Sequence, residues 1–516
     1  MDTATTRLAR VLIVLAAAAL APGVSAADPA PATRPAAFGL RVVDAATGRG
    51  VPLVELKTTS SLRLYTDSAG YVAVDDPALL GRRVFFFVAS HGYQFPADGF
   101  GIRGRAVDLT PGGSAEWKIE RQNVAERLYR ITGEGIYAES VKLGLKPPID
   151  QPLLNAQVTG QDSTQAVVYK GKAYWFWGDT NRQSYALGHF GMSCATSDLT
   201  ESGGLEPGVG INLRYFAGPD GFARGAFEKE GNTLFWMDGP FVVTDAKGGE
   251  HMLATVSLMK SLSECVGRRL VEWDDAAGRF KTLREFPADA RARPHGRVMR
   301  VQVKGRPFIY FGDPQPDVRV QATYEAATEL ANYQAYTCAL PADGGPPRID
   351  RDADGKARYE WRRDADRFGR DEFDELAKRG IAKPDDLLLR PVDVETKKEI
   401  RLHAGSVRWN EHRKRYVMIA NQFGGKASFL GEVYYLESDA PEGPWAKAVK
   451  VVTHDRYSFY NPVHHAFLDR DGERTIHFEG TYAATFSRQG DETPRYDYNQ
   501  VMYKLDLDDP RLTAAR

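Results

Sequence analysis

The feature that most constrains this chain is a strand–turn–strand unit that occurs five times between residues 161 and 481. Each unit starts at a polar or charged residue, continues as an apolar strand, turns through Gly, Lys, Asp or Arg, and ends a second strand in another polar cluster. The units occupy residues 161–180, 237–256, 294–313, 403–422 and 460–481. Repetition at intervals of about 60–110 residues is typical of a propeller with blades of about four strands. We therefore predict an all-β chain with a five-bladed β-propeller over residues 122–516.

A different pattern precedes the repeat. Residues 38–121 alternate apolar and polar positions and contain about seven short strands separated by turns, the spacing of a small β-sandwich. The segments VVDAATGRGVP (42–52) and YTDSAGY (65–71) resemble the carboxypeptidase-regulatory-like, transthyretin-type sandwich. The resemblance implies a module that braces or presents its neighbour, so we expect no chemistry in it. The predicted fold is thus a small β-sandwich followed by a propeller.

The N-terminus has the pattern of a secretory signal peptide. Arg7 and Arg10 precede an apolar run over residues 11–21, and Val24-Ser25-Ala26 supplies a cleavage site. We predict a signal peptide over residues 1–26 and a stiff, proline-rich linker over residues 27–37. A retained membrane anchor is the alternative, but the run is shorter than a bilayer span requires. We therefore expect a secreted or periplasmic protein with no integral membrane segment after signal cleavage.

Composition excludes some partners. The chain has 67 Lys and Arg against 68 Asp and Glu, so the excess of positive charge expected of a nucleic-acid-binding surface is missing. The three cysteines, Cys194, Cys265 and Cys338, are expected to be buried thiols or to form at most one bridge.

Residues 364–398 are strongly charged and predict a solvated insertion with a short helix over residues 371–379. We expect residues 128–137 to close the ring by pairing with residues 499–507.

The propeller geometry predicts where a site would lie. The first strand of each blade begins at one face of the channel, and the second strand returns to that face. Residues that precede the first strand or follow the second are therefore expected around the channel mouth: Asp162, Asp179, Asn181, Arg182, Asp238, His295, Asp313, His403, Asn421, Gln422, Tyr460, Asn461 and Glu479. Local turn chemistry is the alternative, and it fits Asp238 and Asp313 better than Asp162 or Glu479.

Several strings then resemble a known superfamily. GQDS and WFWGDT (within 160–180) and GEVYYLESDAPEGPW (431–445) resemble the five-bladed propeller glycosidases of the arabinanase–xylosidase and invertase–levansucrase clans. The resemblance implies that Asp162 is the nucleophile or general base and that Asp238 orients the general acid and holds its pKa. Glu479 is the first choice for the acid and Glu432 the second, although Asp313 occupies the analogous rim of the middle blade. Two carboxylates across a sugar are what glycosidic cleavage requires.

The predicted function is a secreted glycoside hydrolase acting on a poly- or oligosaccharide by a two-carboxylate mechanism. Catalysis is assigned to Asp162, Asp238 and Glu479, and substrate binding to Asp179, Asn181, Arg182, His295, Asp313, His403, Gln422, Tyr460 and Asn461. No cofactor is expected to be required, and no metal ligands are assigned. A structural calcium ion in the channel remains an alternative. The partner is a carbohydrate, and a monomer is expected.

Two alternatives remain at this point. One is a non-catalytic carbohydrate-binding or scaffold propeller, but such a propeller would repeat its binding residues in each blade, and this chain does not. The other is a polysaccharide lyase with Tyr460 or a histidine as base and Arg182 or Arg319 neutralising a uronate.

Overall fold

The computed structural model describes residues 36–287, 290–340, 348–487 and 492–516. The predicted signal peptide and most of the linker lie outside the described residues. Strands dominate the rest of the chain, so the all-β class is confirmed. No helix in the described ranges is both long enough and apolar enough to cross a bilayer.

Residues 38–121 form two four-stranded sheets, called here the N-terminal unit. The sheets have the orders β4-β1-β8-β6 and β3-β2-β5-β7, and β1 runs parallel to β8. Leu40, Val42, Val54, Phe86 and Ile119 belong to the hydrophobic cluster between them. The strands are β1 (Phe38–Asp44), β2 (Glu55–Thr58), β3 (Arg63–Tyr65), β4 (Tyr71–Val74), β5 (Arg83–Ala89), β6 (Tyr93–Gln94), β7 (Gly104–Asp108) and β8 (Ser114–Arg121).

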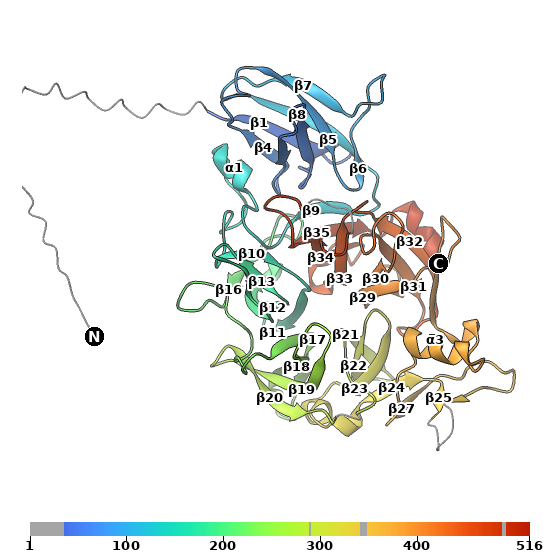
Figure 1. Cartoon of the computed structure of the whole chain (residues 1–516). Helices are drawn as coiled ribbons and strands as arrows, with labels where there is room; N and C mark the ends of the chain where they lie inside the picture. The colour runs from blue at the N-terminus through green and yellow to red at the C-terminus, as the bar shows by residue number, and fades with distance from the viewer. Residues whose placement is uncertain (1–35, 288–289, 341–347, 488–491) are drawn as a thin grey trace, which may run out of the picture.

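Five further sheets follow in chain order, and we call them sheets 1 to 5. Figure 1 shows them around a common centre, with the first strand of each, β11, β17, β21, β29 and β33, nearest that centre. Sheet 1 contains β11 (Gln165–Tyr169), β12 (Lys172–Trp177), β15 (Ser193–Asp198) and β16 (Arg214–Tyr215). Sheet 2 contains β17 (Leu234–Thr244), β18 (Glu250–Met259), β19 (Cys265–Asp274) and β20 (Arg279–Glu285).

Sheets 3 to 5 are antiparallel as well, except that β28 pairs parallel with β32 in sheet 4. Sheet 3 contains β21 (Arg297–Val303), β22 (Arg306–Gly312), β23 (Pro316–Gln321), β24 (Gln334–Thr337) and β27 (Glu360–Arg363). Sheet 4 contains β29 (Leu402–Asn410), β30 (Arg415–Gln422), β31 (Val433–Ser438), β32 (Trp445–Val452) and β28 (Leu389–Asp393). Sheet 5 contains β33 (Ser458–His464), β34 (Thr475–Ala483), β35 (Asn499–Asp506) and β9 (Glu126–Arg130).

Sheet 5 joins the two ends of the ring. Strand β9 pairs antiparallel with β35, with Tyr129 opposite Met502. The predicted partner strand is confirmed, but the early strand covers residues 126–130 rather than 128–137. It ends there because Gly133 and Gly135 follow with φ of +93° and +62°, which a strand does not tolerate.

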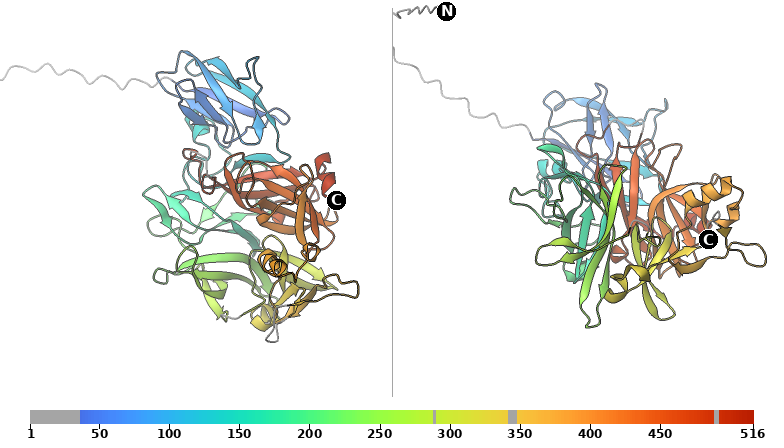
Figure 2. Two further views of the ribbon diagram at one scale, coloured as in Figure 1. Left: turned by 45° about the vertical axis from the view of Figure 1, so that its right-hand side comes forward. Right: turned by 60° about the horizontal axis from the view of Figure 1, so that its bottom comes forward.

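The N-terminal unit covers the outer edge of β9. The Arg127 N–H donates to the Tyr93 hydroxyl (3.4 Å), and the Arg130 N–H donates to Ser68 Oγ (3.1 Å). Arg49 donates to the Leu128 carbonyl (3.1 Å). Both views of Figure 2 show the N-terminal unit against this side of sheet 5. Its side chains therefore satisfy backbone groups that an edge strand would otherwise leave unpaired.

Some local expectations need correction. Residues 158–189 also form a small sheet that the pattern did not predict, with β10 (Val158–Gln161), β13 (Thr180–Arg182) and β14 (Tyr185–His189). The charged segment contains the expected helix, α3 (Arg370–Lys378), but β28 within it pairs parallel with β32, so it is partly integrated into sheet 4. Cys194 and Cys338 are buried free thiols, whereas Cys265 is exposed because it opens β19 beside the 260–264 turn.

The remaining elements are short. They include α1 (Ala138–Lys142), α2 (Tyr324–Ala327), and a two-stranded sheet of β25 (Ala339–Leu340) and β26 (Arg348–Ile349). The 3-10 helices are η1 (Thr200–Ser202), η2 (Leu330–Asn332), η3 (Pro384–Asp386), η4 (Ala466–Leu468) and η5 (Pro510–Ala515).

Candidate active site

Asp162 lies in the turn between β10 and β11, where sheet 1 meets sheet 5. The Tyr460 hydroxyl donates to Asp162 Oδ2 (3.1 Å), and the Tyr498 hydroxyl also donates to this carboxylate. The turn is fixed by sheet 5, because Asn461 Nδ2 donates to Ser163 Oγ (2.8 Å). A side chain at Gly178 would place its Cβ 2.2 Å from Asp162 Oδ1, so only glycine leaves room for the carboxylate.

The environment of Asp162 favours its protonated form. Burial, and then the neighbouring Asp179 carboxylate, raise the pKa of Asp162 from 3.8 to about 6. Donation from the two tyrosines offsets part of that rise. Burial also raises the pKa of Asp179, whose Oδ1 accepts the Gly191 N–H (3.1 Å). This half of the mouth therefore holds a carboxylate pair supported by neutral donors.

A second carboxylate pair lies where sheets 2, 3 and 4 meet. Asp238 is at an irregularity of β17, and its Oδ1 accepts the Gly296 N–H from sheet 3 (2.9 Å). Asp313 directly follows β22, and its Oδ1 accepts the Gly405 N–H from sheet 4 (2.8 Å). Each carboxylate thus receives a backbone N–H from the next sheet in the ring. Local turn chemistry does not account for these inter-sheet hydrogen bonds.

Burial dominates the electrostatics of this second pair too. Burial first, and the Asp313 carboxylate second, raise the pKa of Asp238 from 3.8 to about 6. Burial likewise raises the pKa of Asp313, although the charge of Arg297 opposes the rise. Asp313 is the more exposed member of the pair.

Arg297, which the sequence analysis did not select, lies between the two halves. It opens β21, is only 7% exposed, and donates to the Asn461 carbonyl of sheet 5 (3.2 Å). Its charge acts on both Asp238 and Asp313, and burial lowers its own pKa. Its Nε has no hydrogen-bond partner in the described part of the chain. The prediction considered residues that precede the first strand, such as His295, whereas Arg297 is the first residue of the strand itself.

The two predicted histidines lie on the same side of the mouth as Asp313. His295 accepts from Arg367, and desolvation lowers its pKa well below 6.5. His403 is exposed at the rim, stacks on Phe423 with ring centroids 6.2 Å apart, and also has a lowered pKa because of desolvation. Both rings are therefore neutral near pH 7.

Other residues that were predicted to bind substrate make contacts within the protein. Arg182 pairs with Asp220 (3.0 Å) and lies over the Phe222 ring. Asn181 lies in β13 opposite Gly160. Gln422 accepts from the Tyr434 hydroxyl (3.4 Å), and Asn421 donates to the Leu430 carbonyl (3.2 Å) within sheet 4. Arg319, the alternative uronate-binding residue, bonds Gln334 and Tyr310 and lies over Trp361.

Glu479 lies in the middle of β34 and not at its end, because that strand continues through Ala483. It is completely buried, with His465 Nε2 2.6 Å from its Oε1 and Thr164 donating to its Oε2 (3.2 Å). Glu432 is buried as well and pairs with Lys450 (2.9 Å). Neither carboxylate is exposed to a substrate at the mouth.

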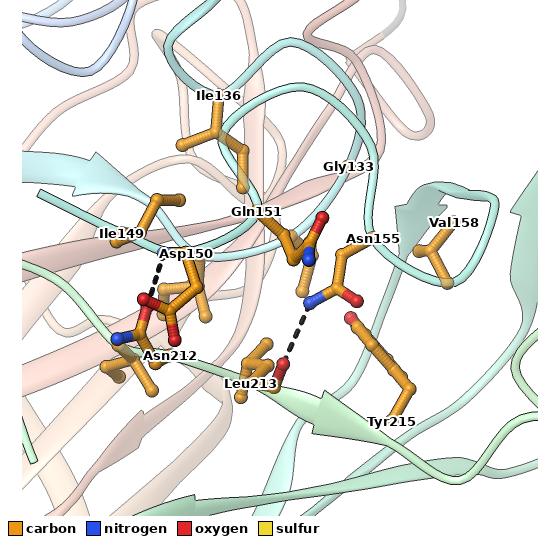
Figure 3. A pocket seen from close by; sticks show the side chains of 13 residues that line it. Gly133, Ile136, Ile149, Asp150, Gln151, Asn155, Val158, Asn212, Leu213 and Tyr215 are labelled. Carbon is orange, nitrogen blue, oxygen red and sulfur yellow. Dashed lines mark hydrogen bonds between the residues drawn. The ribbon is translucent and has the colours of Figure 1, made fainter. Parts of the chain in front are cut away.

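A separate pocket lies beside the ring, outside the predicted mouth. It is lined by residues of the 131–158 segment and by Asn212, Leu213 and Tyr215 (Figure 3). Asn155 Nδ2 donates to the Leu213 carbonyl (2.8 Å), and the Asp150 N–H donates to Asn212 Oδ1 (2.9 Å). Its cavity volume is about 20 Å³, which admits about one water molecule. This pocket is a packing seam and too small for a sugar.

The described ranges contain no group of three or more His, Cys, Asp or Glu side chains arranged to hold a metal ion. The carboxylate pairs at the mouth are the chemically distinctive feature of the site.

No protein-family model matches the chain, and no curated protein matches it. Among solved structures it is similar to a thermostable family-43 glycoside hydrolase, at 12% identity over 67% of this chain and 88% of that one, with a TM-score of 0.29. An exo-β-1,3-galactanase from Clostridium thermocellum matches at 12% identity over 68% of this chain and 61% of that one, with a TM-score of 0.32.

An N-acetylgalactosamine deacetylase from F. plautii matches at 10% identity over 76% of this chain and 98% of that one, with a TM-score of 0.38. Because all three TM-scores are below 0.5, these likenesses carry no weight for the function of this chain.

Proposed function

We propose that this protein is a glycoside hydrolase, built as a five-bladed β-propeller with an N-terminal β-sandwich and exported from the cell. The observation that carries the proposal is the presence of two carboxylate pairs with raised pKa values in different sectors of one ring, with Arg297 beside the second pair and hydrogen-bonded to sheet 5. Glycosidic cleavage needs one carboxyl group that gives a proton and one that takes a proton or attacks carbon.

Asp162 is the base or nucleophile in this proposal. Its surroundings contain hydroxyl donors and the Asp179 carboxylate, and these groups, together with burial, are the main influences on its pKa. Burial and the Asp179 charge favour a carboxylate that gains a proton during the reaction, because both raise its pKa.

The Asp238–Asp313 pair, and not Glu479, supplies the acid. Asp313 is the more exposed of the two and is the proton donor to the leaving group, and its charge raises the pKa of the neighbouring Asp238. Asp313 gives its proton to the glycosidic oxygen as the C–O bond breaks. Water adds to the anomeric carbon, and its proton passes to Asp162. Arg297 then stabilises the carboxylate that proton donation leaves behind.

Two exposed aromatic side chains near the mouth suit a sugar partner. Phe423 is 41% exposed beside His403, and Phe486 is 53% exposed with its ring 5.5 Å from that of Tyr460. The lyase alternative with Tyr460 as base is less well supported, because burial and the Asp162 charge raise the pKa of Tyr460 well above 10, so its hydroxyl is not ionised at neutral pH.

The test is a screen of leader-free protein against a polysaccharide panel with reducing-end detection. On the substrate found, Asp162→Asn lowers turnover by roughly 10² or more, the usual effect of losing acid–base help. Asp220→Asn, which removes an exposed carboxylate paired with Arg182, is the matched control and retains activity. Full activity of the Asp162→Asn variant, or unsaturated products absorbing in the near ultraviolet, would contradict the proposal.

A further inference from the structure

We propose that Arg268, Arg293 and Arg367, called here the arginine cluster, form a subsite for an oxyanion carried by the substrate, a carboxylate or a sulfate on a sugar unit. The inference rests on the proposed function, because it names the class of glycan that the same mouth would accept. The cluster lies where sheets 2 and 3 meet, next to Asp238.

The strand register places Arg268 on the same face as Asp238. Asp238 pairs with Thr255, and Thr255 pairs with Leu270 on the next strand. Arg268 is two residues before Leu270 and therefore points to the same side of sheet 2 as Asp238. Leu270 belongs to the hydrophobic cluster that sheet 2 shares with sheet 3, so this face looks toward sheet 3.

The other two arginines reach the same place from sheet 3 and from the charged insertion. Arg293 is two residues before His295, which is hydrogen-bonded to the Arg293 carbonyl. Arg367 is in the segment between β27 and α3, and it donates to the His295 ring. The His295 ring therefore holds the insertion against the segment that contains Arg293.

The cluster has more positive than negative charge. Neither Arg268 nor Arg293 forms an ion pair within the described ranges, and Arg367 has one acidic partner, Asp317 at 3.5 Å. Burial, then the charges of Arg268 and Arg367, lower the pKa of Arg293. Burial raises the pKa of Asp317 to about 7, so this acid is only partly ionised at neutral pH. The exposed Asp366 is also nearby, but its ion pair is with Arg291 (3.9 Å).

Other arginines of this protein contrast with the cluster. Arg351 has a bidentate pair with Asp386 (2.8 Å), and Arg413 pairs with the buried Glu437. Guanidinium groups that repel one another without matching acids gain most from an external anion, and their planar fork matches a carboxylate or sulfate in geometry. An anion bound here would lie beside Asp238, which fits an acidic unit adjacent to the scissile bond.

The experiment compares binding and cleavage of paired glycans. Uronate-containing oligosaccharides are tested beside their carboxyl-reduced forms, and sulfated oligosaccharides beside their desulfated forms. Arg268→Gln and Arg293→Gln are measured singly and together, and Arg300→Gln, an exposed arginine of β21 outside the cluster, is the matched control. Thermal midpoints and circular dichroism show whether each variant folds.

Wild type is expected to bind one acidic glycan at least about tenfold more tightly than its neutral form, the usual effect of a charge-assisted hydrogen bond. The double variant loses that preference through KM and loses salt sensitivity. Its kcat changes by the same factor on the acidic and the neutral form, because the Arg268 charge also lowers the pKa of Asp238. The glycan pair in which the acidic form binds more tightly than the neutral form shows whether the bound anion is a carboxylate or a sulfate. Equal preference in wild type and the double variant, or no binding of either acidic glycan, would overturn the subsite.

Binding is measured by calorimetry on Asp162→Asn as well, so the result does not depend on turnover. If wild type binds the acidic glycan through the arginine cluster but cleaves no glycan, the proposed hydrolysis is wrong and the subsite is supported. If wild type cleaves neutral glycans and the cluster variants bind and cleave all glycans as wild type does, hydrolysis is supported and the subsite is wrong.

Discussion

The two halves of the mouth hold similar carboxylates in different ways. Where sheets 1 and 5 meet, Asp162 is supported by the hydroxyls of Tyr460 and Tyr498. Where sheets 2 to 4 meet, Asp238 and Asp313 are supported by backbone N–H groups and lie near Arg297. Burial raises the pKa values of Asp162 and Asp238 to about 6, so the pKa values alone do not show which carboxylate is the acid and which is the base.

The nature of the supporting groups does separate them. The tyrosine hydroxyls offset only part of the rise in the pKa of Asp162, whereas Arg297 supplies a cation that stabilises the carboxylate left when Asp313 loses a proton. The comparison therefore assigns base and acid roles that a pair of equal pKa values would leave open.

The largest expected effect distinguishes the two roles by leaving group. Asp162→Asn and Asp313→Asn should each lower turnover of the natural glycan by roughly 10²–10⁴. On an aryl glycoside with an acidic phenol leaving group, Asp313→Asn should regain most of its activity, because that leaving group needs no proton. Asp162→Asn should stay impaired on both. The measurement is kcat on the two substrates, and equal impairment of Asp313→Asn on both would reverse the assignment.

A smaller effect concerns the cation. Arg297→Gln removes a charge that lowers the pKa values of Asp238 and Asp313. The limb of the pH–activity profile that belongs to the acid should therefore move to higher pH, and kcat should fall by about tenfold. Arg408→Gln, at a half-buried arginine of β29, is the comparison for general loss of stability. A lower kcat with an unmoved limb would mean that Arg297 only supports the fold.

The smallest effect is on stability. The pKa of Asp162 is about 6 in the folded protein and near 3.8 in the unfolded chain, so ionisation costs stability, and this cost appears as pH rises through about 6. Asp162→Asn should therefore raise the melting temperature relative to wild type by about 1–3 °C at pH 8. The difference should vanish near pH 4. Thermal scans of both proteins across this range check the sign, and a variant that is less stable at pH 8 would contradict it.

Much of the strand pattern could be predicted because apolar runs and turn residues alternate regularly in the chain. The units at 237–256 and 294–313 became β17–β18 and β21–β22. Strand β10 and its partners were missed because strands of three to five residues with Gly and polar side chains carry no clear period.

The proposed site residues follow the same division. The places of Asp162, Asp238 and Asp313 at strand ends or turns could be predicted because their positions relative to the strands are set by local sequence. Glu479 could not be judged, because the sequence does not show that β34 continues past it or that His465 covers its carboxylate. Arg297 could not be recognised, since its importance comes from Asn461, which is 164 residues away.

The pairing of β9 with β35 also bears on how the chain is made. Arg130 and Val501 are register partners, and they are 371 positions apart (501 minus 130). During synthesis, β9 is made long before β35, so its pairing partner is absent until nearly the whole chain has been made. The N-terminal unit is complete by then, and its Tyr93, Ser68 and Arg49 hold backbone groups of β9. The N-terminal unit can therefore protect the backbone of β9 from non-native strand pairing until β35 has been made.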